Sequence, residues 1–168
     1  MKNIVKNKEP FKQLGFGKLE TAEIVKKLNK TLATYQVFYH KLQKFHWNVV
    51  GSDFFDIHDL TEDLYRNAIE EIDDIAERIR VFGQSPTSSM YSYLNDSLIE
   101  EAEEEKSGEY MVYEIINDLQ VLAETFLDAH EYCTKNGDIG TAHMISQMIK
   151  NLETYHWQLT AWSNRKFA

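Results

Sequence analysis

Two histidines and three of the acidic residues between positions 46 and 77 together have the chemistry of a transition-metal site. Neutral imidazole nitrogen and carboxylate oxygen suit iron, manganese and zinc, and carboxylates favour the harder, oxidised iron(III). Whether these groups can reach one metal depends on the elements that carry them. The five candidate ligands are His46, His58, Glu62, Asp73 and Glu77.

Four of these residues share one face of a predicted helix. Counting about 100° per residue from His58, Glu62 lies at about 40°, Asp73 at about 60° and Glu77 at about 100°. His58 and Asp73 are nevertheless 15 residues apart, which is roughly 22 Å along a helix. Either they are unrelated polar residues, or the helix packs antiparallel against its symmetry mate. In the second case His58 and Glu62 face Asp73 and Glu77 of the partner subunit, so the site lies between subunits.

Four long amphipathic helices are predicted around these residues, because apolar side chains recur at spacings of three and four. We expect them at residues 19–50, 52–82, 108–135 and from 138 onward. Gly51 and Gly83 should end the first two, and Ser52 or Asp53 and then Asp138 should cap the second and fourth. Residues 83–106 form a long polar connection with a short helix near residues 90–94. The sequence therefore predicts an all-α, ferritin-like four-helix bundle with a long crossover between the second and third helices.

Composition excludes several classes of protein. The chain has 168 residues, of which 43% are hydrophobic and 27% charged, and this is typical of one globular domain. No apolar run approaches the ~18 residues of a membrane span. The single Cys133 cannot form an internal disulfide, so a reduced cytoplasmic setting is expected, with Cys133 as a small core residue.

The charge divides the chain into a basic tail and an acidic body. Residues 1–18 hold five lysines and one glutamate, a balance of +4, whereas the other 150 residues carry −13. We expect residues 1–18 to be a flexible tail and residues 19–168 to be the bundle domain. The acidic body attracts cations. Weak, salt-sensitive DNA binding is expected of the tail, through Lys2, Lys6, Lys8 and Lys12.

Two segments resemble a known family. The run FHWNVVGSDFFDIHDLTEDLY at residues 45–65 and the run IDDIAERI at residues 72–79 closely resemble the DNA-protection-during-starvation (Dps) family of mini-ferritins. The ligand types and both intervals, 12 and 15 residues, match that family's motif. The helix order and the closing segment at residues 156–159 are also similar, so the resemblance covers residues 19–162.

The resemblance implies a ferroxidase, an enzyme that oxidises iron(II). In that family two histidines and an acidic residue of one subunit match His46, His58 and Glu62, and an Asp and a Glu of the two-fold partner match Asp73 and Glu77. The cargo would be iron, oxidised by hydrogen peroxide or oxygen and stored as ferric mineral in a hollow homododecamer. This would protect against oxidative damage in the cytoplasm, with nucleoid association as an added expectation.

Trp47 matches a tryptophan that the family places beside the site, where it is thought to intercept oxidising radicals. A packed aromatic is the alternative reading. The family often has an acidic, pore-lining residue shortly after a Thr-Ala pair in the fourth helix. Here His143 follows Thr141 and Ala142, which leaves Asp138 as the remaining acidic candidate.

Two other functions remain open at this point. A conventional di-iron bundle needs Glu-x-x-His on two helices, and this chain has one such motif, Glu153 to His156. A nucleoid-binding structural protein with secondary iron chemistry is the second alternative. We expect the remaining histidines to be ordinary structural or surface residues; these are His40, His130, His143 and His156.

Overall fold

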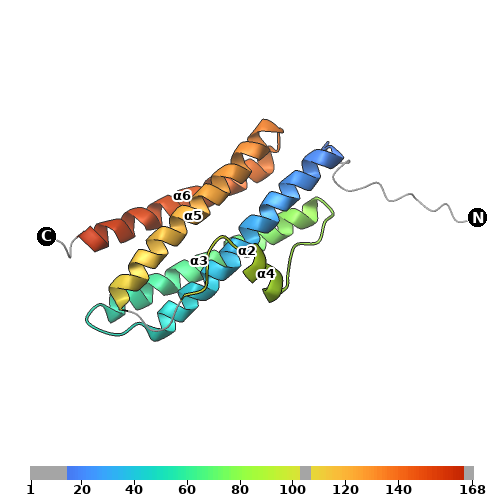
Figure 1. The fold of residues 1–168 in the computed structure, drawn as a ribbon. Coiled ribbons are helices and arrows are strands. Elements are labelled where there is room, and N and C mark those ends of the chain that lie inside the picture. Colours follow the sequence, from blue (N-terminus) through green and yellow to red (C-terminus); the bar gives the residue numbers. More distant parts are fainter. Residues whose placement is uncertain (1–14, 103–106, 165–168) are drawn as a thin grey trace, which may run out of the picture.

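The computed structural model describes residues 15–102 and 107–164, and every regular element within them is an α-helix. Four long helices and one short helix follow one another along this part of the chain (Figure 1). They are α2 (Lys18–Asn48), α3 (Phe54–Val81), α4 (Met90–Asp96), α5 (Gly108–Lys135) and α6 (Ile139–Asn164). The predicted all-α class and the four long helices are confirmed.

The long helices form two antiparallel pairs. α2 packs along α3, α5 packs along α6, and contacts between α2 and α5 join the pairs. The long connection after α3 carries α4 past α2, and α5 then begins at the end of the bundle where α3 begins (Figure 1). As a result α3 and α5 run in the same direction, which is what a long crossover between the second and third bundle helices produces.

The helix ends confirm some predicted boundaries and correct others. α2 ends at Asn48, slightly before the predicted end, and Gly51 takes a left-handed φ of 110° in the turn that follows. Asp53 occupies the N-cap position of α3, but its side chain makes no capping hydrogen bond, so the cap predicted there is absent. By contrast, Asp138 Oδ1 accepts a bond of 3.1 Å from the backbone N–H of Thr141, as predicted for the start of α6.

The predicted apolar stripes line the centre of the bundle. The largest wholly buried side chains include Tyr35, Phe38 and Phe126, drawn from α2 and α5. Cys133 is 2% exposed, and burial raises the pKa of its thiol to about 12. A thiol that stays protonated in an apolar setting is a packing group, which confirms the prediction for Cys133.

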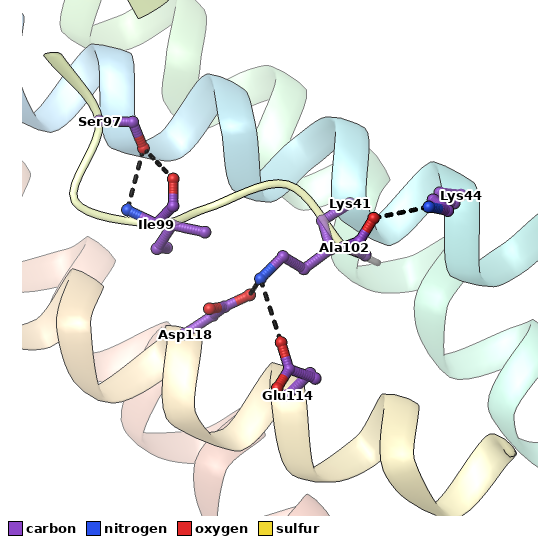
Figure 2. Close-up of polar contacts among 7 residues, drawn as sticks. All are labelled: Lys41, Lys44, Ser97, Ile99, Ala102, Glu114 and Asp118. Atoms are coloured by element: carbon purple, nitrogen blue, oxygen red, sulfur yellow. Dashed lines mark hydrogen bonds and ion pairs between the residues drawn. The ribbon is translucent and has the colours of Figure 1, made fainter. Parts of the chain in front are cut away.

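Beneath the crossover, α2 and α5 share a buried group of charges, which we call the Lys41 cluster: Lys41, Glu114 and Asp118 (Figure 2). The Lys41 ammonium, 3% exposed, lies 2.8 Å from Asp118 Oδ2 and 3.4 Å from Glu114 Oε2. Nearby, Lys44 Nζ donates to the backbone carbonyl of Ala102 at 2.6 Å and so ties the crossover to α2 (Figure 2). The chain therefore folds with its crossover anchored close to paired charges.

Some expectations fall outside the described residues. The predicted basic tail lies there up to residue 14, including Lys2, Lys6, Lys8 and Lys12, and so do residues 103–106 of the acidic stretch. Among the helices that the structure describes, none is both long and apolar enough to cross a membrane.

Candidate metal centre

The end of α2 and the start of α3 bring His46 and His58 together. His46 lies in the last turn of α2, and His58 lies in the second turn of α3, across the short connection between the two helices. Their rings stack with centroids 3.7 Å apart and planes inclined by 22°. We call these two residues the histidine pair. Its geometry depends on the tight turn, because a longer loop would not hold two helix ends in this register.

Each imidazole of the histidine pair is oriented by the backbone of the other histidine. His46 Nδ1 lies 2.8 Å from the carbonyl oxygen of His58, and His58 Nδ1 lies 2.9 Å from that of His46. A carbonyl oxygen only accepts, so both Nδ1 atoms must carry the proton and donate it. In the neutral ring the lone pair then resides on Nε2. Both histidines are thus held in the tautomer and orientation of a metal ligand.

Glu62 places a carboxylate one helical turn after His58, where it could bind the same metal. One ligand atom each from His46, His58 and Glu62 lie within 4.8 Å of one another, and this is the only group of three or more His, Cys, Asp or Glu with such geometry among the described residues. Arg66 donates to Glu62 Oε1 through Nε at 2.9 Å and Nη2 at 2.5 Å. The Arg66 hydrogen bond lowers the pKa of Glu62, with a smaller contribution from the charge of Arg66 and of both histidines. Both bonds use Oε1, so Oε2 remains for a cation.

Aromatic rings flank the histidine pair on both sides. The Phe54 ring stacks on His58 with centroids 4.9 Å apart, and the edge of the Tyr65 ring meets His46 at 5.3 Å. His46 is 8% exposed, whereas His58 and Glu62 are half-buried. The histidine pair is therefore covered by aromatic rings from α2 and α3, while His58 and Glu62 stay partly accessible to solvent.

Asp73 and Glu77 are not brought to the histidine pair within one chain. Both are exposed on α3, which runs without a break from Phe54 to Val81. The separation of roughly 22 Å expected from helix geometry therefore persists. Within one chain, the structure therefore holds His46, His58 and Glu62 together where α2 meets α3, and it leaves Asp73 and Glu77 farther along α3.

Trp47 directly follows His46 and is 69% exposed. No stacking contact joins its ring to either histidine among the described residues. Its role beside the site stays a prediction.

The other sequence candidates lie elsewhere. His156 Nε2 is 3.2 Å from the side-chain nitrogen of Gln120, and Glu153 is exposed, so the single Glu-x-x-His motif joins no metal group in the described residues. Asp138 is buried and caps α6, and both of its carboxylate oxygens accept hydrogen bonds from Arg78 and Thr141; a role for Asp138 in a pore between subunits stays a prediction.

Sequence reasoning missed Arg66 and Tyr65. Arg66 had a signal, because Glu62 and Arg66 stand four residues apart on a helix, the spacing at which opposite charges pair. Tyr65 had none, because its contact with His46 crosses between two helices.

A bundle of four long helices with one long crossover between the second and third is the arrangement of a ferritin-like protein. In agreement, the sequence model of the ferritin-like domain matches residues 25–166. The DNA protection during starvation protein 2 of Bacillus anthracis is 34% identical over 143 residues, covering 85% of this chain and 98% of that one. The DNA protection during starvation protein of Brevibacillus brevis is 36% identical over 134 residues, covering 80% of this chain and 90% of that one.

Solved structures agree. Dps from Vibrio cholerae O1, described as a member of a broad superfamily of ferritin-like diiron-carboxylate proteins, superimposes with a TM-score of 0.83 at 31% identity, covering 86% of this chain and 91% of that one. A Dps protein from Bacillus brevis superimposes with a TM-score of 0.84 at 33% identity, and the match covers 88% of this chain and 99% of that one. The chain belongs to the Dps family of mini-ferritins.

Proposed function

We propose that this protein is a ferroxidase that oxidises iron(II) at a site shared by two subunits and stores the ferric product inside a hollow homo-oligomer. The observation that carries the proposal is the reciprocal Nδ1 hydrogen bonding of His46 and His58. It leaves two Nε2 lone pairs beside the Glu62 carboxylate. Such a set of ligands suits iron better than it suits an alkaline-earth cation.

The acidic half-site completes this centre from a second copy. Asp73 and Glu77 are exposed on α3, on the same face as His58 and Glu62, and an antiparallel α3–α3 contact would place them opposite the histidine pair of a second copy. Asp73 and Glu77 of the partner subunit would add negative oxygens, which bind iron(III) more strongly than iron(II). The shared site thereby favours oxidation of the bound metal. The dodecamer is the oligomer that the family resemblance implies.

The oxidant in this proposal is hydrogen peroxide, with oxygen as a slower substitute. One peroxide takes two electrons, one from each of two iron(II) ions, and with two protons it becomes two waters. The products are two iron(III) ions, which hydrolyse to ferric oxide. Removing iron(II) and peroxide together prevents the one-electron reaction that releases hydroxyl radical, and this protects the cell.

Complementation between two inactive chains tests the shared site. Chains carrying H58A or D73N/E77Q should each fail to oxidise iron(II) anaerobically with added peroxide. After co-refolding, random pairing makes half of the dimers mixed, and each mixed dimer keeps one intact site, so about one quarter of the wild-type activity should return. Native mass spectrometry verifies mixing and gives the particle size. Absence of recovery in verified mixed particles would show that the ligands are not shared.

Weak DNA binding is a second proposal, supported by the +4 charge of residues 1–18 and by the names of the relatives. Many tails on one shell would act together, so weak phosphate contacts would be reinforced by avidity. The −13 charge of the remaining residues opposes this. A mobility shift should therefore appear at low salt only and vanish when residues 1–12 are deleted. Binding that survives the deletion would assign DNA contact to another surface.

A further inference from the structure

The first residue of α5 closes against the connection between α2 and α3. Gly108 is buried, and α5 begins there, beside the turn that joins the two helices (Figure 1). A Cβ atom on Gly108 would lie 2.6 Å from Ile57 Cδ1 and 3.6 Å from Val49 Cγ2. Carbon atoms in favourable contact are separated by about 3.5–4.0 Å. Glycine at this position therefore permits an approach that a side chain would prevent.

Both residues that pack against Gly108 stand next to the histidine pair. Ile57 directly precedes His58 on α3, and Val49 is the C-cap of α2, three residues after His46. The backbone N–H of Val49 donates at 2.9 Å to a carbonyl in the last turn of α2. Ile57 is 1% exposed and Val49 2%. A close-packed interior leaves both little room to give way, so a larger residue at position 108 would press on the backbone that carries the two imidazoles.

Thr61 links Ile57 to the hydrogen bonds of the histidine pair. The wholly buried Thr61 hydroxyl lies 2.6 Å from the Ile57 carbonyl oxygen and 3.0 Å from the His58 carbonyl oxygen, and the two oxygens share its one proton. The same His58 carbonyl accepts the Nδ1 proton of His46 at 2.8 Å. A displacement of Ile57 would therefore reach the acceptor that orients the His46 ring.

We infer that Gly108 is a positioning residue for the metal centre. Because Gly108 has no side chain, the start of α5 rests on Ile57 and Val49. This contact holds the α2–α3 connection in the form that stacks the two imidazole rings with centroids 3.7 Å apart. The inference rests on the proposed function in one respect, that the histidine pair binds the metal. If Gly108 served the packing of the bundle alone, its substitution would lower stability and leave metal binding as it is.

The decisive substitution is G108A together with its rescue by I57V. Alanine is a better helix former than glycine, and the φ of Gly108 is not in the left-handed region that favours glycine. Any loss in G108A must therefore come from the added Cβ atom. Valine at position 57 lacks the Cδ1 atom that this Cβ would meet, so G108A/I57V makes room for it. I57V alone is the matched control for the smaller side chain.

Cobalt(II) binding to the assembled protein is the measurement, because the visible d–d bands of cobalt(II) report the number and geometry of its ligands. The part of the spectrum that H46A/H58A loses is the signal of the histidine pair. Thermal unfolding by circular dichroism is recorded in parallel, and native mass spectrometry checks the particle size. G140A is the control for a crowded glycine elsewhere, since a Cβ on Gly140 of α6 would lie 3.1 Å from Arg78 Nη2.

G108A should bind cobalt(II) at the histidine pair roughly tenfold more weakly than wild type, with shifted d–d bands. G108A/I57V should recover the affinity and the spectrum of wild type, and I57V and G140A should keep them. A wild-type cobalt(II) signal in G108A would overturn the inference, whatever its melting temperature. A defect in G108A that I57V does not relieve would overturn it too.

T61V tests the same link without enlarging any residue, and it decides the case if G108A does not assemble. Valine keeps the branched shape of Thr61 and removes the hydroxyl group that the Ile57 and His58 carbonyls share. The d–d bands of T61V should therefore differ from those of wild type, and identical bands would overturn the inference. Wild-type protein without a histidine-dependent cobalt(II) signal would instead overturn the metal centre, and with it the proposed function.

Discussion

The histidine pair and the Lys41 cluster both begin on α2, five residues apart, yet their polar atoms are satisfied in opposite ways. In the Lys41 cluster the ammonium is matched by two carboxylates of α5, within 2.8 and 3.4 Å. In the histidine pair, Nδ1 of each ring donates to a backbone carbonyl, and no hydrogen bond to either Nε2 is found within the part of the chain that the structure describes. The Lys41 ammonium is paired with charges of its own chain, although the buried Asp118 Oδ2 has this ion pair and no hydrogen bond in the described residues, whereas the histidine pair keeps two nitrogen lone pairs that a metal could use.

The difference shows that α2 carries one group that affects the stability of the fold and another that is suited to bind a metal. A buried charge needs an opposite charge beside it, because an uncompensated charge that has lost its hydration strongly destabilises the folded state. Neutral imidazoles avoid that cost and can be left with a lone pair exposed to the site. Substitutions in the two groups should accordingly affect different measurements, stability in the first and iron oxidation in the second.

The largest effect is expected from K41M. It leaves the Asp118 carboxylate buried without its counter-charge, which costs about 3 kcal/mol of stability when a buried pair is broken. The melting temperature measured by circular dichroism should fall clearly. In the double variant K41M/D118L both charges are gone, and most of the stability should return. Equal melting temperatures for K41M and wild type would mean that the pairing of Lys41 with Asp118 does not stabilise the fold.

The next effect belongs to H46A/H58A. Loss of both nitrogen ligands should slow iron(II) oxidation roughly 100-fold, equivalent to about 2.7 kcal/mol of activation free energy. The melting temperature should change little, since alanine supports both helices. H130A/H143A is the matched control, because it removes two histidines from α5 and α6 outside the site. Unchanged kinetics in a folded H46A/H58A protein would refute the assignment of the metal centre.

A smaller effect concerns pH and Asp118. Burial raises the pKa of Asp118 to about 6 from 3.8, Lys41 lowers it in part, and Glu114 adds to the rise. The native state therefore holds this proton more tightly than the unfolded state, so the contribution of Asp118 to stability falls as the pH rises from about 4 to about 6. D118N removes this loss of stability with rising pH. The melting temperature of D118N should therefore climb more steeply between about pH 4 and about pH 6 than that of wild type. Parallel curves would contradict the raised pKa.

The smallest effect is expected from R66Q. Arg66 holds the pKa of Glu62 below its ordinary value, mainly through its hydrogen bond. Without it Glu62 takes up a proton at a higher pH, so the acid limb of the iron-oxidation profile should move upward while the rate at pH 7 changes little. R80Q changes another exposed arginine of α3 and should leave the profile in place. An acid limb that stays in place in R66Q would remove Glu62 from the ligand set.

Much of the fold was predictable because helix periodicity and turn residues are local signals. α5 was expected at residues 108–135 and occurs there, and the cap at Asp138 was foreseen. The cap at Asp53 failed, since an N-cap residue type does not ensure that its side chain turns back toward the helix. The pairing of Lys41 with Asp118 was not foreseen, because it joins residues 77 positions apart on different helices.

The sequence alone determined the ligand types, their shared helical face and the distance that prevents Asp73 from joining His58 in one chain. These follow from residue identity and from the fixed rise of an α-helix. The tertiary structure decided the rest: that the α2–α3 turn stacks His46 on His58, that each ring donates to the other's backbone, and that Tyr65 lies against His46. The physical reason is that spacing along a helix is set by local geometry, whereas contacts between helices depend on how whole faces pack.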